Sequence, residues 1–316
     1  MRNISIVGCG FVGNALIEGM KHAYEVLSYD KFNKERSTEK TLEDLVSKSE
    51  SIIFVAVPTP MKSTGECDIS IVESVIAEID EICKEKKIYE HIDLIMRPTL
   101  TLVIKSTIPP GTTEYLNDKY RFVNVAFNPE FLTEKNSVND FKEQNRIVIG
   151  YGPTHHFAQQ DMVLKGIEWF YKKAYPNVPI LKTSAATAEM VKYTTNCFLA
   201  TKVSFANELF QLCNKLGINY GEMINVAKYD ERLGDSHWMV PGPMPDPQGN
   251  LKLGFSGSCF IKDLNALMFV AKQLGIDPKV MNGVWEKNLE VRPERDWEQL
   301  VGRAVVDPKK DGKKNT

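Results

Sequence analysis

Several features that would place a protein in a class at once are scarce in this chain of 316 residues. The six cysteines include no CxxC pair, which disfavours a disulfide framework and indicates a reducing, cytoplasmic environment. The five histidines show no HExxH or cysteine-paired spacing, so we predict no metal site. No apolar run approaches the ~18 residues that a membrane-spanning helix needs. A net charge of −2 offers no basic field to nucleic acid or an anionic membrane, so we expect small-molecule partners.

The first informative pattern is a strand, a glycine turn and a helix. An apolar run at 3–7 leads into Gly8, Gly10 and Gly13, and a helical pattern follows. Such a turn needs its first glycine for the bend, its second for the approach of a pyrophosphate, and its third for packing of the helix on the strand. The pattern predicts dinucleotide binding. The alternative is a glycine turn with a structural role only.

Asp30 extends this pattern. It follows a second predicted strand at 25–29 and lies twenty positions after Gly10. A carboxylate at this place binds the ribose hydroxyls of NAD and repels the extra phosphate of NADP. We therefore expect NAD as the cofactor.

Strand and helix patterns alternate through the first 184 residues. We predict strands at 52–57, 102–105, 122–126, 146–150 and 178–182, and helices at 69–86 and around 162–171. The segment 88–100 is ambiguous and fits a loop insertion. The turns at 58–60 and 106–111 directly follow strands, where open α/β sheets bind their ligands.

After residue 182 the pattern becomes helical. Residues 185–216 contain neither Gly nor Pro and are followed by Gly217, which predicts one long helix. Further helical patterns, at about 220–228 and 262–289, are separated by a loop rich in Pro and Gly at 240–257. We predict an α/β protein with a Rossmann-like, doubly wound parallel sheet, followed by a long-helix, all-helical second domain. The expected parts are an NAD-binding domain at 1–184, a helical domain at 185–300 that contains Cys259, and a disordered tail at 301–316.

The stretch GFSGSCFIKD at 254–263 carries the reactive residue types. Glycines precede Cys259 and none follows, so we predict a helix that starts at about 258. Unpaired N–H groups at that helix start would favour the thiolate of Cys259. Lys262 and Asp263 follow at i+3 and i+4 on the same face, and the three groups together suit covalent chemistry on a carbonyl. The alternative is a structural cysteine beside two solvated charges.

Eight motifs, taken in order, resemble those of the UDP-glucose/GDP-mannose dehydrogenase family. They are GCGFVG (8–13), VPTP (57–60), KST (105–107), NPEFLTE (128–134), AEMVKYTTNCFLATK (188–202), NEL (207–209), DERLG (230–234) and GSCFIKD (257–263). The resemblance covers most of residues 1–290. It departs from the family at Lys135 and Ser256, where the family has glycine, and at Ile261, where it has proline. The family's third, nucleotide-gripping domain does not follow, so we expect a shortened form.

The resemblance implies an NAD-dependent four-electron oxidation of a nucleotide sugar, with UDP-glucose to UDP-glucuronate as the first expectation. It implies that Cys259 holds the aldehyde as a thiohemiacetal and then as a thioester. The other implied catalytic residues are Lys192 with Asn196 for the negative oxygen, Asp263 with Thr107 for the water, and Glu130 as general acid/base at hydrolysis.

The resemblance also implies binding residues and an assembly. The cofactor would contact Gly8, Gly10, Phe11, Val12, Gly13, Asp30, Val57, Pro58, Thr59, Ser106, Thr107, Glu134 and Lys262. The nucleotide-sugar substrate would contact Glu130, Phe131, Leu132, Glu134, Lys192, Asn196, Arg232, Leu253, Gly254, Phe255 and Gly257. A homodimer would form through the 185–216 helix.

The stretch 236–253 looks longer than the family's usual approach to the cysteine loop. We expect Trp238 to offer a stacking face, and His237 and Lys252 to donate to the pyrophosphate in place of the third domain. The alternative is a flexible surface loop.

Two other functions remain open. A two-electron β-hydroxyacid dehydrogenase also joins a Rossmann domain to a helical one through a long helix with a catalytic lysine, but it needs no cysteine. A non-catalytic module that binds NAD or a nucleotide sugar needs none of the thioester residues. Counting the NADH formed per substrate separates all three.

Overall fold

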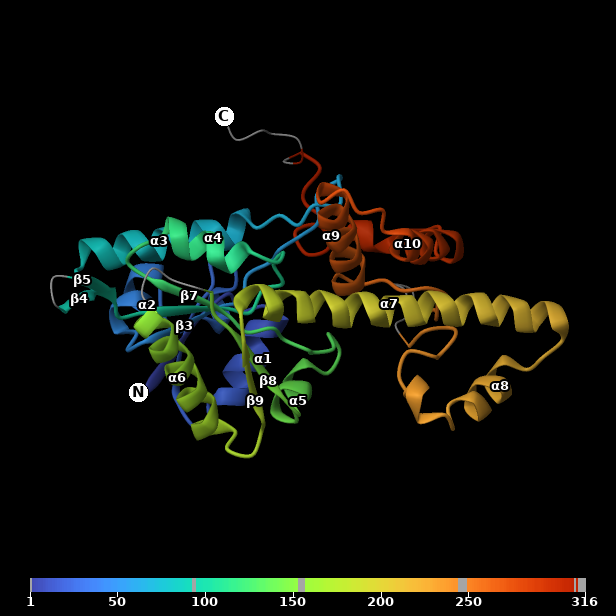
Figure 1. Cartoon of the computed structure of the whole chain (residues 1–316), viewed down its shortest axis with the longest axis horizontal. Coiled ribbons are helices and arrows are strands. Elements are labelled where there is room, and N and C mark those ends of the chain that lie inside the picture. The colour runs from blue at the N-terminus through green and yellow to red at the C-terminus, as the bar shows by residue number, and fades with distance from the viewer. Residues whose placement is uncertain (1, 93–94, 153–156, 244–248, 310, 312–316) are drawn as a thin grey trace. The chain divides into compact units, whose positions relative to one another are not determined.

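The computed structural model describes the whole chain except residues 1, 93–94, 153–156, 244–248, 310 and 312–316 (Figure 1). The chain divides into two compact units. Unit 1 comprises Met1–Thr59 and Ile69–Lys192, and unit 2 comprises Pro60–Asp68 and Tyr193–Thr316. The division departs from the predicted boundary at 184, because the long helix contributes to both units and the 60–68 segment belongs to the second.

Unit 1 is built on a seven-stranded sheet in the order β2-β1-β3-β6-β7-β8-β9. Its strands are β1 (Asn3–Val7), β2 (Glu25–Tyr29), β3 (Ile52–Val55), β6 (Thr101–Ile104), β7 (Asn124–Phe127), β8 (Ile147–Gly150) and β9 (Ile180–Thr183). Neighbouring strands pair in parallel except β7 and β8, which meet antiparallel where Phe127 faces Gly150. The Rossmann-like class is confirmed, with the correction that the sheet is mostly rather than wholly parallel.

Helices cover both faces of this sheet, because successive strand residues point to opposite sides. On β3, Ile53 and Val55 join the core under α2 (Leu42–Lys48), α3 (Ser70–Glu85) and α4 (Thr112–Lys119). Ile52 and Phe54 join the core under α1 (Phe11–Met20), α5 (Ser137–Lys142) and α6 (Phe157–Ala174). Figure 1 shows α3 and α4 on one side of the strands and α1 and α6 on the other.

The ambiguous segment 88–100 contains a hairpin. Strands β4 (Tyr89–Ile92) and β5 (Ile95–Pro98) pair antiparallel as a separate two-stranded sheet. The expected loop insertion is thus a short β-hairpin, followed by β6.

The long helix α7 (Ala185–Leu216) has the predicted bounds. At its start, the Ser184 hydroxyl accepts a hydrogen bond from the Thr187 N–H at 3.2 Å, which caps one of the unpaired donors. At its end, Gly217 adopts φ +69°, and the Ile218 N–H donates back to the Cys213 carbonyl at 2.9 Å. A left-handed glycine with such a bond is a common helix stop.

Unit 2 continues with α8 (Tyr220–Ala227), α9 (Cys259–Gln273) and α10 (Lys279–Val291). The single pattern predicted at 262–289 is two helices, because Gly275 turns the chain at φ +75° and Pro278 precedes α10. The 60–68 segment pairs with the chain's later part, since Met61 bridges Val305. Ala304 is fully buried, so the chain is packed at least through 304–306, which the expected disordered tail included. In the described part of the chain, no helix is both long and apolar enough to cross a bilayer.

Candidate active site

The glycine turn of unit 1 is shaped for a group that approaches Gly10. A Cβ on Gly8, which has φ +94°, would lie 2.5 Å from the Ala56 carbonyl oxygen, and one on Gly13 would lie 1.8 Å from the Gly8 carbonyl oxygen. Both positions therefore require glycine for packing. A Cβ on Gly10 would meet nothing within 4 Å, so the backbone there is open to a ligand. Phe11 and Val12 begin α1 directly after this turn.

Asp30 lies against the same turn. Its carboxylate accepts hydrogen bonds from the Cys9 N–H at 2.7 Å, the Phe32 N–H at 2.8 Å and the Asn33 N–H at 2.9 Å. Burial alone would raise the pKa of Asp30, but these backbone donors lower it below the ordinary value. The group is therefore a carboxylate at neutral pH, held at the end of β2 beside the glycines.

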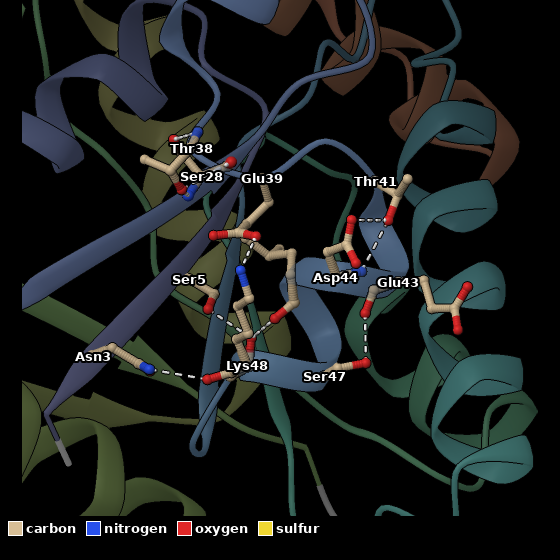
Figure 2. Close-up of polar contacts among 12 residues, drawn as sticks. Asn3, Ser5, Ser28, Thr38, Glu39, Thr41, Glu43, Asp44, Ser47 and Lys48 are labelled. Atoms are coloured by element: carbon tan, nitrogen blue, oxygen red, sulfur yellow. Dashed lines mark hydrogen bonds and ion pairs between the residues drawn. The ribbon is translucent and has the colours of Figure 1, made fainter.

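The chain around Asp30 is fastened to its neighbours. Figure 2 shows Ser28 and Thr38 side by side, and the Ser28 N–H donates to the Thr38 hydroxyl at 2.8 Å. In the same view the Lys48 ammonium meets the Glu39 carboxylate at 2.6 Å, and Thr41 caps α2 by accepting from the Asp44 N–H at 3.0 Å. These ties hold the loop after β2, and with it the position of Asp30.

The other predicted cofactor residues of unit 1 follow the central strands. The Ser106 hydroxyl donates to the Val57 carbonyl at 2.6 Å, which joins the two turns after β3 and β6. Thr59 and Thr107 are buried, Pro58 is exposed, and Glu134 is half-buried. The structure therefore brings the two turns together at the carboxyl edge of the sheet, as their strand positions predict.

Lys192 and Glu130 form a buried ion pair in unit 1. The Lys192 Nζ lies 2.9 Å from Glu130 Oε1, and the two side chains are 3% and 4% exposed. Lys192 also donates to the Glu130 carbonyl at 2.7 Å and lies over the Phe131 ring, 5.7 Å from its centroid. Burial alone would raise the pKa of Glu130, but the Lys192 charge and hydrogen bond and the Leu132 N–H hold it below its ordinary value. The structure thus joins four of the predicted residues.

A second buried lysine, Lys105, was not among the predicted site residues. Its ammonium donates to Asn128 Oδ1 at 2.9 Å, and its side chain is buried at the end of β6. Burial lowers the pKa of Lys105 to about 7, in spite of the favourable charge of Glu130. Lys105 and Glu130 line a pocket of about 340 Å³ within unit 1. A lysine that follows a strand is ordinarily expected to be solvent-exposed. The only signal in the sequence that could have identified Lys105 is its place in the KST motif.

Cys259 is the first residue of α9 in unit 2, where the glycine pattern places the helix start. It is half-buried, whereas the other five cysteines are buried. Burial raises the pKa of Cys9 to about 11 and that of Cys83 to about 12, so those thiols stay protonated at neutral pH. Cys259 alone combines access with a helix N-terminus, the setting typical of a reactive cysteine.

The residues after Cys259 form a polar cluster inside unit 2. The Lys262 ammonium lies 2.6 Å from Asp263 Oδ1, and the Asn196 amide donates to Asp263 Oδ2 at 2.5 Å. Asp263 is 1% exposed. Burial alone would lower the pKa of Lys262, but Asp263, followed by Cys67 and Cys259, raises it above the ordinary value. A permanent cation therefore interacts electrostatically with Cys259, and a neighbouring cation is typical of a reactive cysteine.

The loop before Cys259 is held by α10 and the residue that follows it. Asn288 Oδ1 accepts from the Phe255 N–H at 2.7 Å, and Arg292 donates to the Leu253 carbonyl at 3.0 Å. Gly254 has φ +68°, and a Cβ there would lie 2.5 Å from Asn288 Oδ1, so this position requires glycine. Asn288 and Arg292 are buried and were not predicted, because no motif in the sequence marks them.

The remaining predicted residues of unit 2 are placed differently. Arg232 is 88% exposed and pairs with Asp230, two residues earlier. Trp238 is buried, and its indole N–H donates to the Gly234 carbonyl at 2.8 Å, so the expected stacking face is not exposed. The His237 ring packs near the Phe260 ring, and the Lys252 Nζ lies 3.4 Å from Glu294 Oε1. Among the described residues, no group of three or more His, Cys, Asp or Glu side chains is placed to hold a metal ion.

Two family models match the sequence of this chain. Residues 24–168 match the NAD binding domain of the UDP-glucose/GDP-mannose dehydrogenase family, and residues 186–290 match the central domain of the same family. The two matches together cover more than half of the chain. The chain belongs to the UDP-glucose/GDP-mannose dehydrogenase family. The expected NAD-binding domain is thereby confirmed.

Individual members of the family are similar in sequence and structure. The chain is 35% identical over 248 residues to the UDP-glucose 6-dehydrogenase of Rickettsia bellii, across 77% of this chain and 50% of the relative. It is 31% identical over 330 residues to the UDP-glucose 6-dehydrogenase TuaD of Bacillus subtilis, across 92% and 64%. A solved UDP-glucose dehydrogenase from Pyrobaculum islandicum superposes with a TM-score of 0.76 at 28% identity, across 93% of this chain and 69% of that one. The chain thus spans about half the length of the first of these relatives.

Proposed function

We propose that this chain carries the NAD-dependent four-electron oxidation of a nucleotide sugar's primary alcohol to a carboxylate, with UDP-glucose as the first candidate substrate. One observation supports this most strongly: the accessible thiol of Cys259 stands at a helix start, and a buried Lys262–Asp263 pair follows on the same helix. A two-electron dehydrogenase needs no such thiol. The NAD-binding domain and the named relatives support the same reaction class.

The residues of the glycine turn fit NAD. The open backbone at Gly10 suits the pyrophosphate, and the carboxylate of Asp30 suits the ribose hydroxyls. When bound, NAD supplies the hydride acceptor for both oxidations. The predicted contacts of Val57, Ser106 and Glu134 with the cofactor belong to the same proposal.

The chemistry assigned to the protein's own groups is covalent. The Cys259 thiolate adds to the aldehyde carbon, a C–S bond forms, and the oxygen takes up a proton to give a thiohemiacetal. After the second oxidation a thioester remains on Sγ. Water then adds to its carbonyl, the C–S bond breaks, and the acid is released as the thiolate returns.

The polar residues would assist these steps. The ammonium of Lys192, fixed by Glu130, would stabilise the negative oxygen, with Asn196 one turn later on α7. Glu130 would take a proton from the attacking water, and Asp263 with Thr107 would orient that water. Mixing the protein with UDP-glucose and NAD, quenching in acid and measuring intact mass tests the proposal. We expect a sugar-nucleotide adduct on Cys259, and its absence at every quench time would contradict the covalent route.

We predict a preference for NAD over NADP of at least about tenfold, which corresponds to about 1.4 kcal/mol. The reason is that the ionised Asp30 would face the extra phosphate of NADP. Asp30→Ser should lower this ratio in steady-state kinetics, whereas Lys31→Ala, which removes the adjacent cation, should raise or preserve it. Equal parental activity with both cofactors would contradict this assignment.

We also propose that α7 forms a homodimer contact. Phe198, Phe205 and Leu212 are 64%, 53% and 53% exposed, and their spacing of seven places them along one face of the helix. Such an apolar row in water is costly unless another surface covers it. A Phe198→Glu, Phe205→Glu double variant should sediment as a monomer, while Trp169→Glu on α6, also an exposed aromatic, should keep the parental mass. A monomeric parental protein would refute the proposal.

A further inference from the structure

The buried amine of Lys105 has no part in the reaction assigned above, yet it lies in the polar cluster of Glu130 and Lys192. It follows β6, is 3% exposed, and reaches Asn128, the residue that follows β7. Burying a lysine is costly, and such a residue is kept where its amine has a defined partner. Among the described residues, the hydrogen-bond partner of this amine is the amide oxygen of Asn128.

Asn128 is fixed from three sides. Its Oδ1 accepts from the Lys105 amine at 2.9 Å and from the Tyr171 hydroxyl at 2.5 Å, and its Nδ2 donates to the Val148 carbonyl at 2.6 Å. The three bonds reach three different parts of the chain: the residue after β6, helix α6 and strand β8. The amide therefore fastens the start of the turn that follows β7.

That turn carries Glu130 two residues later. Its other end is held by Lys192, which donates to the Glu130 carbonyl at 2.7 Å and pairs with the carboxylate at 2.9 Å. Lys105 and Lys192 therefore hydrogen-bond to the two ends of the Asn128–Glu130 turn. The turn cannot shift without breaking one of these buried bonds.

We propose that Lys105 is a positioning residue for Glu130, holding the carboxylate where it serves hydrolysis of the thioester on Cys259. This inference rests on the proposed function. The geometry fits the role, because the Lys105 amine donates its hydrogen bond to Asn128 whether or not it is protonated. Lys105 would thus fix the geometry of Glu130 through Asn128 and not through a direct hydrogen bond.

Lys105→Met tests the inference, because methionine is of similar length but has no donor. With UDP-glucose and NAD, we expect the rapid formation of two NADH per Cys259 to persist. Turnover should fall by about 10-fold to 100-fold, the usual cost of a misplaced catalytic group, and the thioester should accumulate in acid-quenched intact mass. The matched control is Lys182→Met, which removes an exposed lysine, 41% accessible, from β9 of the same unit and should turn over at the parental rate.

A second variant distinguishes loss of the amine from misfolding of the protein. Lys105→Ala leaves space beside a pocket of about 340 Å³, so added propylamine should enter and restore turnover in a saturable way. Turnover and adduct level unchanged in Lys105→Met, or no rescue of a slowed Lys105→Ala, would overturn the inference alone. A parental protein that makes fewer than two NADH and no adduct would overturn the proposed function, and this inference with it.

Discussion

Replacing Cys259 with serine should reduce turnover of UDP-glucose to the acid by at least about 10³-fold, on the scale of other enzymes that lose a covalent nucleophile. Serine keeps the shape of the side chain, but its hydroxyl is not ionised at neutral pH and cannot form the thioester. Since the glycine turn and Asp30 lie in unit 1 and Cys259 lies in unit 2, NAD binding should be unchanged.

Pre-steady-state NADH release and calorimetric titration with NAD measure the two halves of this expectation. Cys213→Ser is the matched control, because Cys213 is a buried cysteine on α7 with no role in the proposed reaction. It should turn over at the parental rate. A Cys259→Ser protein that still delivers two NADH per sugar at that rate would exclude the covalent mechanism.

Lys192→Met should lower turnover by about 10²-fold to 10³-fold, the usual effect of removing one group that stabilises a developing oxyanion. It should also destabilise the protein by about 3–5 kcal/mol, because the Glu130 carboxylate would stay buried without its cation. Thermal unfolding and kcat measure the two effects. Lys215→Met, an exposed lysine near the end of the same helix, should change neither.

The contribution of the Lys192–Glu130 ion pair to stability should depend on pH. The folded pKa of Glu130 lies below its ordinary value, so the pair contributes fully above the unfolded carboxyl pKa and is lost as pH falls through the folded one. In Lys192→Met the pKa of Glu130 should rise, and the variant should gain stability relative to the parent as pH is lowered. The double variant Lys192→Met, Glu130→Gln removes both charges and should recover much of the lost stability but no activity. If the single variant is as stable as the parent at neutral pH, the ion pair does not contribute to stability as predicted.

Much of the fold could be predicted from local patterns. The glycine turn, the strand ending at Asp30 and the bounds of α7 each depend on residues close in sequence, where turn chemistry and helix stops act directly. The position of Cys259 at a helix start could be predicted for the same reason. Local pattern also misled, for example at 262–289, where the apolar spacing continues through the turn at Gly275 that separates α9 from α10.

The rest depends on contacts between distant segments. Lys105 and Asn128 are 23 residues apart, and only the parallel pairing of β6 and β7 brings them together. Arg292 reaches back to the Leu253 carbonyl across 39 residues. The sequence predicts that Trp238 is an exposed aromatic side chain in a polar loop, whereas the structure buries it. These residues have structural roles because they are buried, and no single sequence motif predicts that burial.

The most direct test of the central claim is the number of NADH molecules formed per molecule of UDP-glucose when the sugar nucleotide is limiting and NAD is in excess. The account predicts two, with UDP-glucuronate as the product and no aldehyde captured by an added hydrazine. One NADH per sugar would contradict it and indicate a two-electron dehydrogenase. No NADH with NAD binding intact would contradict it as well, and would indicate a binding module.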